Sequence, residues 1–345
     1  EPIVIEIKGH LSGQDGDEQV FHAYAGTTNA TDRSIMNVVY SSVLNKILIS
    51  KPFLEANILV NGQDQTEYAV SGGSEVNVDV NWANNLSTRI TDGQIIINLS
   101  GNAYDKNNVI VNNGFFDSIN NQIIWDKNSV SNLSEINPGE SGTVSFSFKP
   151  ISLIGLSDTI KSPKVSIKVS IKGRQPQLGS TYTDVNNFSE KIVKISSDFQ
   201  IASSVSYFYG NNPPKAESET KYVVTWTLSN SANSISGAQA RSSLPIYVNW
   251  VGITAGENEN VSYNEVTREV TWTIGSVNPN TGIDSNREAS FVVSLKPSLS
   301  QVGSIVQIMK ELYLTGTDSF TGTAIKSTRG AISTSLAGGD GRVVQ

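Results

Sequence analysis

Residues 165–172 read Val165-Ser166-Ile167-Lys168-Val169-Ser170-Ile171-Lys172, with each apolar side chain two positions from the next. Successive side chains of a β-strand point to opposite faces, so this stretch predicts a strand with one apolar and one polar face. The same alternation occurs in 76–82 and 143–148. Strands with one wet face belong to antiparallel sheets, and two such sheets bury their apolar faces by packing together. The sequence therefore predicts an all-β fold of antiparallel β-sandwiches.

The composition of the 345 residues supports this fold class and excludes several kinds of site. Apolar residues make up 38% and charged residues 17%, both below the usual share, yet enough β-branched residues remain to build sheet cores. The net charge of −7 argues against nucleic acid as a partner, because that partner requires a basic surface. The absence of cysteine excludes disulfides and thiolate sites, and it favours an exported bacterial protein.

Part of the chain is repeated. The pairs Lys149-Pro150 and Lys296-Pro297 each follow a predicted strand and lie 147 residues apart. The tryptophans of the preceding strands, Trp125 and Trp272, have the same spacing. Self-similarity at a fixed period is the signature of tandem modules, each built around its own core. We therefore expect one complete unit followed by another.

A second pair of tryptophans repeats with a slightly different spacing. Trp82 and Trp226 end similar alternating strands 144 residues apart. Tryptophans at repeated positions inside strands are typical of sandwich cores, where each buries a large area. We predict that Trp82, Trp226, Trp125 and Trp272 are core residues. Trp250 breaks the repeat, and we expect it in the core as well, with an exposed carbohydrate-binding platform as the alternative.

The first residues of the chain form a third, partial copy. Residues 3–9 resemble 165–173, and residues 10–60 resemble 174–210. We therefore predict three parts: residues 1–60 as the C-terminal part of a β-sandwich module, and residues 61–205 and 206–345 as complete modules. The aromatic run Tyr207-Phe208-Tyr209 lies near the second boundary, and we expect it to form the contact between modules.

The repeated segments resemble a known kind of module. The segments that carry the resemblance are Trp272-Thr273-Ile274-Gly275, Asn278-Pro279, Phe291–Leu295, Lys296-Pro297-Ser298, Asn211–Lys215, Tyr222–Asn230, Leu244-Pro245, Val248-Asn249-Trp250, Ser298–Gly303 and Leu314–Gly322. With them the sequence is similar to the immunoglobulin-like conserved repeat domains of bacterial and archaeal surface proteins, and its C-terminal third resembles large surface proteins of ultra-small, host-associated candidate-phylum bacteria. The stretch 151–205 departs from the repeat pattern.

The resemblance implies tandem immunoglobulin-like domains outside the cell, and it supplies no catalytic residues. We expect a non-catalytic structural or adhesive protein of the bacterial cell surface, such as a stalk, surface-layer or filament subunit. The expected partners are other copies of the chain, other surface proteins, host-cell surfaces or glycans, with any membrane attachment through an anchor outside this chain. The alternative function is an array of carbohydrate-binding modules in a larger exported protein.

One turn carries a candidate metal site. Asp15, Asp17 and Glu18 place carboxylates around Gly16, an arrangement of oxygen ligands that calcium accepts. The full twelve-residue calcium loop is absent, and a solvated acidic turn is the commoner explanation of such a cluster. Calcium is thus the one cofactor that the sequence raises. His10 and His22 are the only histidines, and without a nearby cluster they do not predict a zinc site or a catalytic triad.

Overall fold

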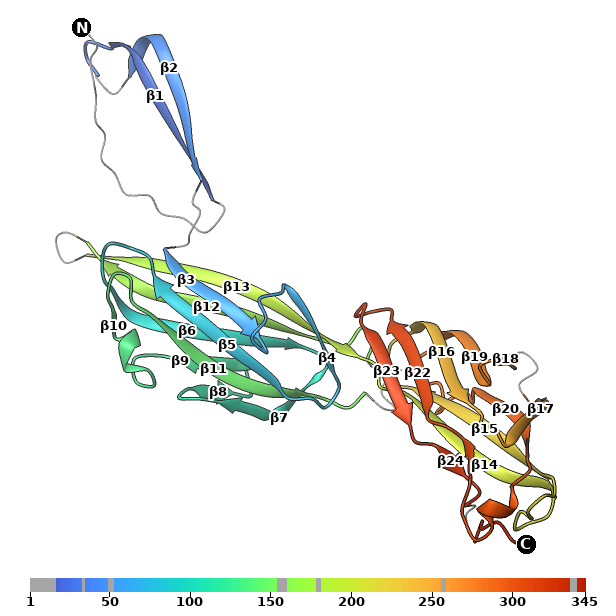
Figure 1. Cartoon of the computed structure of the whole chain (residues 1–345). Helices are drawn as coiled ribbons and strands as arrows, with labels where there is room; N and C mark the ends of the chain where they lie inside the picture. The colour runs from blue at the N-terminus through green and yellow to red at the C-terminus, as the bar shows by residue number, and fades with distance from the viewer. Residues whose placement is uncertain are drawn as a thin grey trace.

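The computed structural model describes residues 17–32, 35–48, 53–153, 160–177, 181–255, 259–335 and 340–345. Within these ranges the chain is built from strands, and its helical elements are two short 3₁₀ turns, η1 (Ser131–Leu133) and η2 (Leu299–Gln301). The strands form a hairpin and two β-sandwiches that follow one another along the chain (Figure 1). The predicted all-β, immunoglobulin-like antiparallel fold is confirmed.

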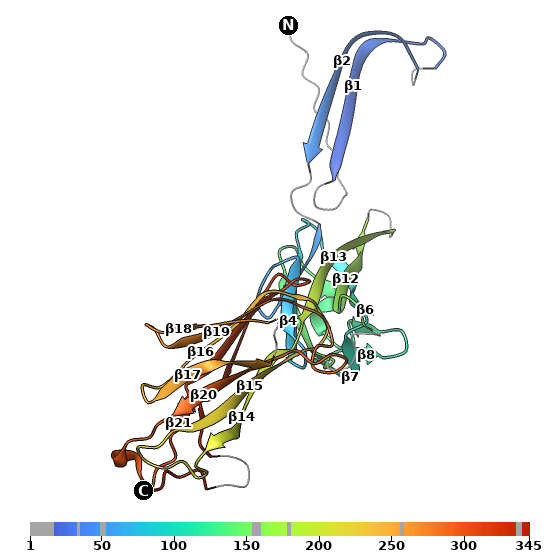
Figure 2. The same ribbon diagram turned by 90° about the vertical axis from the view of Figure 1, so that its right-hand side faces the viewer.

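The hairpin consists of β1 (Glu18–Thr28) and β2 (Met36–Leu48), paired antiparallel. It stands apart from both sandwiches in the two views (Figures 1 and 2). Its side chains are nearly all exposed, although many are apolar, including Phe21, Tyr40 and Leu44. An exposed apolar surface of this kind is unusual for a complete folded module.

The first sandwich packs a four-stranded sheet in the order β3-β5-β11-β7 against a larger sheet in the order β4-β13-β12-β6-β9-β8, with β10 also pairing with β6. All pairs are antiparallel except β4 with β13. The strands are β3 (Leu54–Val60), β4 (Glu67–Ser71), β5 (Val76–Asn84), β6 (Ile90–Gly101), β7 (Tyr104–Val111), β8 (Phe115–Asp117), β9 (Gln122–Trp125), β10 (Glu135–Ile136), β11 (Ser141–Pro150), β12 (Lys164–Pro176) and β13 (Tyr182–Ser196).

The second sandwich packs a sheet in the order β14-β15-β20-β17 against one in the order β18-β19-β16-β22-β23, and a small pair, β21-β24, lies beside them. The strands are β14 (Phe199–Gly210), β15 (Thr220–Asn230), β16 (Ile235–Ser243), β17 (Val248–Ala255), β18 (Asn260–Asn264), β19 (Glu269–Val277), β20 (Glu288–Leu295), β21 (Gln307–Met309), β22 (Leu312–Asp318), β23 (Ala324–Arg329) and β24 (Ile332–Ser333).

The two sandwiches share one topology over nine strands each, while β4, β10, β21 and β24 lie outside the shared pattern. The order β3-β5-β11-β7 corresponds to β14-β15-β20-β17, and the order β8-β9-β6-β12-β13 corresponds to β18-β19-β16-β22-β23. The register agrees at the ends of β5 and β15, where Asn84 lies opposite Leu54 and Asn230 lies opposite Phe199. The stretch 151–205 contains β12 and β13, which are longer counterparts of β22 and β23, so its departure in sequence is not a departure in fold.

Each sandwich has its own core, and the four repeated tryptophans are buried in these cores. The Nε1 of Trp125 donates to the carbonyl of Asn112 at 2.8 Å, and the Nε1 of Trp272 donates to the Glu259 carboxylate at 2.8 Å. Trp250 is half-buried and packs on the second core, stacked on Tyr263 at 5.5 Å. These rings are held on the inside by packing and, at two positions, by a hydrogen bond.

A buried asparagine closes the same corner of both sandwiches. Asn84 ends β5, and its Nδ2 donates to the carbonyls of Thr88 and Ile136 at 3.0 and 2.9 Å. Asn230 ends β15, and its Nδ2 donates to the carbonyls of Asn233 and Asn278 at 2.8 and 2.9 Å. Each amide thus ties the end of its strand to the segment that contains the repeated Asn-Pro. Oδ1 of Asn84 also accepts from the backbone N–H of Leu86 at 3.0 Å, whereas Oδ1 of Asn230 is buried without a hydrogen-bond partner among the described residues. The donated bonds, which the two corners share, favour one arrangement of the loop.

The strand pairing moves the predicted module boundaries. β3, which the sequence analysis assigned to residues 1–60, pairs with β5 through Ile58 opposite Val80. β14 spans the boundary predicted at residue 205 and pairs along its length with β15. The predicted boundaries therefore lie too late in the chain, because both strands bury their alternate side chains in the sandwich that follows. That the preceding residues belong to a further module stays a prediction.

A repeated glycine marks a close approach inside each sandwich. Gly173 in β12 and Gly316 in β22 lie at equivalent points, beside Ile90 and Ile235 at the starts of β6 and β16. A Cβ atom at Gly316 would lie 2.6 Å from Cγ2 of Ile235, far inside van der Waals contact. The absence of a side chain at these positions lets the two strands pack closely.

We expect Gly316→Ala to destabilise the second sandwich by about 1–3 kcal/mol, because the added methyl group overpacks the core against Ile235. Gly330→Ala is the matched control, since a Cβ there has no neighbour within 4 Å. Urea unfolding followed by tryptophan fluorescence measures both. An unchanged midpoint for Gly316→Ala would show that the close approach is not a packing constraint.

Candidate functional site

The junction between the two sandwiches has the densest polar contacts that join separate parts of the fold. Only Ser197 and Asp198 separate β13 from β14. Ser196 and Ser197 are buried, although serine is usually found at surfaces. A linker this short brings the end of one sandwich directly against the loops of the next (Figure 1). The junction is therefore a packed interface and not a flexible tether.

Asp318 is the centre of this interface. It ends β22, it is completely buried, and its carboxylate accepts four hydrogen bonds. Oδ2 accepts from the backbone N–H of Ser197 at 2.8 Å and from Nδ2 of Asn233 at 3.0 Å. Oδ1 accepts from the backbone N–H groups of Phe320 and Thr321, both at 2.9 Å. A buried carboxylate is costly unless it is fully hydrogen-bonded, and these donors satisfy it.

Ser197 and Asn233 extend the network into both sandwiches. Oγ of Ser197 accepts from the backbone N–H of Asn233 at 2.6 Å, and Nδ2 of Asn233 also donates to the carbonyl of Ile195 at 2.9 Å. Ile195 belongs to the core of the first sandwich, while Asp318 belongs to a strand of the second. Outside the network, Nζ of Lys194 lies 5.2 Å from the centre of the Phe320 ring. The contacts therefore fix the orientation of one sandwich on the other.

The junction does not resemble a reaction centre. Its polar atoms are backbone N–H groups, hydroxyls, one amide and one carboxylate, and they point at each other. A cavity of about 300 Å³ adjoins the linker, with Ser71, Ser231 and Lys326 among its lining residues. Sequence reasoning missed the junction, because Ser197 and Asp318 lie 121 residues apart and no local pattern links them.

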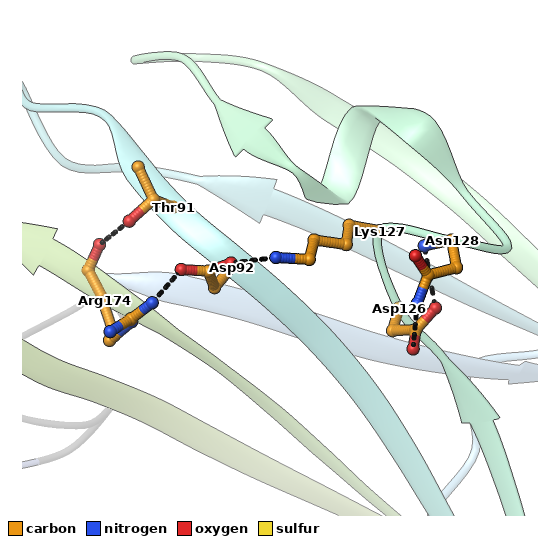
Figure 3. A network of polar contacts seen from close by, with 6 residues as sticks. All are labelled: Thr91, Asp92, Asp126, Lys127, Asn128 and Arg174. Carbon is orange, nitrogen blue, oxygen red and sulfur yellow. Dashed lines mark hydrogen bonds and ion pairs between the residues drawn. The ribbon is translucent and has the colours of Figure 1, made fainter.

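A second polar network clamps the outer face of the first sandwich (Figure 3). Asp92 lies at a bulge of β6 with a left-handed backbone, φ 51°, and Gly237 occupies the equivalent bulge of β16 with φ 59°. Asp92 accepts from Nζ of Lys127 at 2.8 Å and from the guanidinium of Arg174. These hydrogen bonds, chiefly that of Lys127, hold the pKa of Asp92 below its ordinary value.

The clamp is specific to the first sandwich. It joins β6, β12 and the turn after β9, whereas Gly237 has no side chain with which to form one. Asp126 beside Lys127 caps its own turn, accepting from the backbone N–H of Asn128 at 2.8 Å (Figure 3). The bulge is thus a shared feature of the fold, and the ion pairs on it are an addition.

The predicted calcium ligands are only partly within the described ranges. Asp15 lies outside them, while Asp17 and Glu18 stand at the start of β1, where Glu18 pairs with Lys46. In the ranges given above, no cluster of three or more His, Asp or Glu residues could hold a metal ion. Calcium at the full turn stays a prediction. His10 also lies outside the described residues, and Nδ1 of His22 contacts the Tyr24 hydroxyl at 2.9 Å.

The run Tyr207-Phe208-Tyr209 does not form the contact between modules. It lies at the end of β14 that is remote from the junction, and its three rings are exposed. β14 starts at the junction with Phe199 and extends away from it, so the run is carried to the far end of the second sandwich (Figure 1). The expectation was wrong because the junction is made of small polar residues, not aromatic ones.

No protein-family model matches the sequence, and no curated protein matches it. Solved structures resemble it distantly. The C-terminal domain of the antigen I/II-family protein AspA of Streptococcus pyogenes is 12% identical, with 81% of this chain and 99% of that chain covered and a TM-score of 0.29. BcpA, the major pilin subunit of Bacillus cereus, is 9% identical, with 93% and 76% covered and a TM-score of 0.31.

A type I cohesin–dockerin complex from Clostridium thermocellum is similar over a shorter stretch, with 13% identity, 41% and 92% covered and a TM-score of 0.25. Identities and scores this low assign no binding activity to the present chain. A separate finding concerns membranes: the described part of the chain has no helix with the length and apolar character to span a bilayer.

The Asp92 clamp predicts a pH dependence for the first sandwich. Because its pKa is lower in the folded state, Asp92 contributes stability above its unfolded pKa of about 4 and loses that contribution as the pH falls through the folded pKa. We expect Lys127→Met to raise the pKa of Asp92 towards its ordinary value, measured by carboxyl NMR titration.

Lys106→Met is the control, since Lys106 lies on β7 in the other sheet. An Asp92 midpoint at or above the ordinary value in the unaltered chain, or an equal shift with the control, would contradict this assignment.

Proposed function

We propose that the chain is a non-catalytic structural and adhesive element of a bacterial cell surface, in which rigidly joined sandwiches hold a binding surface at a distance. The observation that carries the proposal is the buried junction. There Asp318 of the second sandwich accepts a hydrogen bond from Ser197 of the linker, and Asn233 of the second sandwich donates one to Ile195 of the first sandwich. A buried, hydrogen-bonded carboxylate between modules suits a load-bearing spacer, because a fixed orientation of the modules gives the array its reach.

The duplicated architecture supports the same function. Both sandwiches have the same strand order, and each keeps a separate core, so the array can lengthen by adding modules without changing the fold. The location at a bacterial surface is part of the proposal. It agrees with the pilin and antigen I/II-family structures that the chain distantly resembles, and it depends on the sequence resemblance to surface repeat domains.

The alternative, an array of carbohydrate-binding modules, is constrained by the tryptophans. Trp82, Trp125, Trp226 and Trp272 are buried, so none of them can serve as a platform for sugar rings. Carbohydrate binding would have to use other aromatic residues on a solvent-exposed face.

Asp318→Ala and the nearly isosteric Asp318→Asn test the rigid junction. Removing the carboxylate leaves several buried donors without an acceptor, so we expect the alanine variant to weaken the junction by about 3 kcal/mol and to allow the sandwiches to move independently. Small-angle X-ray scattering and NMR residual dipolar couplings measure this. The unaltered chain should give one alignment for both sandwiches, and the variants should give two.

Asp105→Ala is the matched control, because Asp105 is a half-buried carboxylate on β7 whose hydrogen bonds, to Asn107 and Asn108, stay within its own turn. Separate alignments in the unaltered chain would contradict the proposal. So would Asp318 variants that keep the cores folded and retain a single alignment. The asparagine variant keeps the test valid if the alanine variant unfolds.

A further inference from the structure

The outer face of the first sandwich carries a row of cations on one strand. The pleat of β12 points Lys164, Lys168, Lys172 and Arg174 to solvent, while its alternate residues are buried. Positions four residues apart on a strand are separated by roughly 13 Å. The three lysines therefore form a regular ladder on a protein whose net charge is −7. A concentration of one charge against the overall sign marks a surface that attracts an oppositely charged partner.

Two exposed aromatic rings lie beside this ladder on β13. Phe188 is 54% exposed, and Nζ of Lys168 lies 5.4 Å from its ring centre. Tyr182 is 56% exposed, and Cζ of Arg174 lies 5.2 Å from its ring centre. These cation–π contacts keep each ring next to a positive charge at the surface. Rings of this size at the surface offer a flat apolar area for stacking.

Amide side chains complete the face on both sides of the ladder. Asn98 of β6 lies opposite Lys168, and Asn186 of β13 lies opposite Lys172. Nε2 of Gln122 on β9 donates to Oδ1 of Asn98 at 2.9 Å, which orients that amide. A hollow of about 450 Å³ lies at one end of the row, and Lys172, Arg174 and Asn186 line it together with the carboxylates of Asp92 and Asp184. Amides in such a position both donate to and accept from hydroxyl groups.

The acids of the face leave two lysines available. Asp92 is matched by Lys127 and Arg174, and Glu190 accepts from Oγ of Ser166 at 2.6 Å. Asp184 lies opposite Arg174 in the pairing of β12 with β13. Among the residues that the structure describes, no carboxylate forms an ion pair with Lys168 or Lys172, although Glu190 lies opposite Lys168 in the pairing of β12 with β13. Both ammonium groups can therefore meet an external anion, Lys168 from beside the Phe188 ring.

We propose that this face binds an acidic polysaccharide laid along β12. Lys168 and Lys172 would meet its carboxylate or sulfate groups, Phe188 would stack on a sugar ring, and Asn98 and Asn186 would hydrogen-bond its hydroxyls. Charge alone would suit any polyanion, but the rings and amides beside the lysines favour a sugar over an acidic peptide. The inference gives the adhesive part of the proposed function a ligand class, and it does not depend on the rigid junction.

The second sandwich supplies an internal comparison. The outward positions of β22, the counterpart of β12, are Tyr313, Thr315 and Thr317, which carry no positive charge. The two sandwiches therefore share a fold but differ in this face, and we expect only the first to bind the polymer.

The test uses the full chain and measures binding by calorimetry and by retention on immobilised polymer. The probes are hyaluronate for carboxylates on sugar, dextran sulfate for sulfates on sugar, dextran for neutral sugar and polyglutamate for carboxylates without sugar. We expect binding to at least one acidic polysaccharide, weakening as salt is raised, with dextran and polyglutamate bound at least about tenfold more weakly.

The double variant Lys168→Glu/Lys172→Glu should weaken binding by about tenfold or more, since each reversal replaces an attraction by a repulsion. Phe188→Ala should weaken it several-fold. Lys106→Glu makes one such charge reversal on β7, away from the face, and should leave affinity within about twofold. The altered side chains of the face point to solvent, and thermal unfolding midpoints verify that each variant is folded.

Four results would overturn the proposal: no binding to hyaluronate or dextran sulfate, a double variant that binds as well as the unaltered chain, dextran bound equally well, or polyglutamate bound equally well with no effect of Phe188→Ala. None of these outcomes alters the alignment of the two sandwiches. The ligand assignment and the rigid junction can therefore fail separately.

Discussion

The long central strands of the two sandwiches have one face that must be kept from water, and that constraint determines the architecture. Alternate side chains such as Val76, Val78 and Val80 are fully buried, while their neighbours face outward. A single sheet with this pattern cannot hide its apolar face, so two sheets close on each other around the buried tryptophans. The outer faces of the sheets do not have to pack against another sheet. The features that distinguish the two modules lie on these outer faces or at the ends of the modules.

The junction applies a different physical rule. Apolar contact alone would let two modules slide, because it has no direction. Asp318 introduces direction, since each of its four hydrogen bonds requires a particular donor in a particular place. The equivalent end of the first sandwich has a hydrogen bond between neutral groups instead, in which Nε2 of Gln175 donates to Oγ1 of Thr88 at 2.8 Å. The same position of the fold thus joins modules at one end and remains a surface contact at the other.

Differences between the modules arise where the shared fold permits them. The bulge on β6 and β16 needs a residue that tolerates a positive φ, which both aspartate and glycine do. At that position Asp92 forms ion pairs with Lys127 and Arg174, whereas Gly237 has no side chain that could form them. On the outer face of β12, Lys172 and Arg174 likewise stand at the positions that Thr315 and Thr317 occupy on β22. A repeat protein can in this way keep one core design and give each module its own surface.

The β character, the antiparallel sandwiches and the burial of Trp82, Trp125, Trp226 and Trp272 could be predicted from the sequence, because alternation and repetition are local properties of the chain. Tertiary structure alone decided that β3 and β14 belong to the sandwiches that follow them, since either edge of a strand can pair and the choice depends on distant partners. It also brought Ser197 to Asp318 across 121 residues, and Asp92 to Arg174 across 82. Contacts between residues so far apart in the sequence produce no periodic pattern in it, so only the folded structure reveals the junction and the clamp.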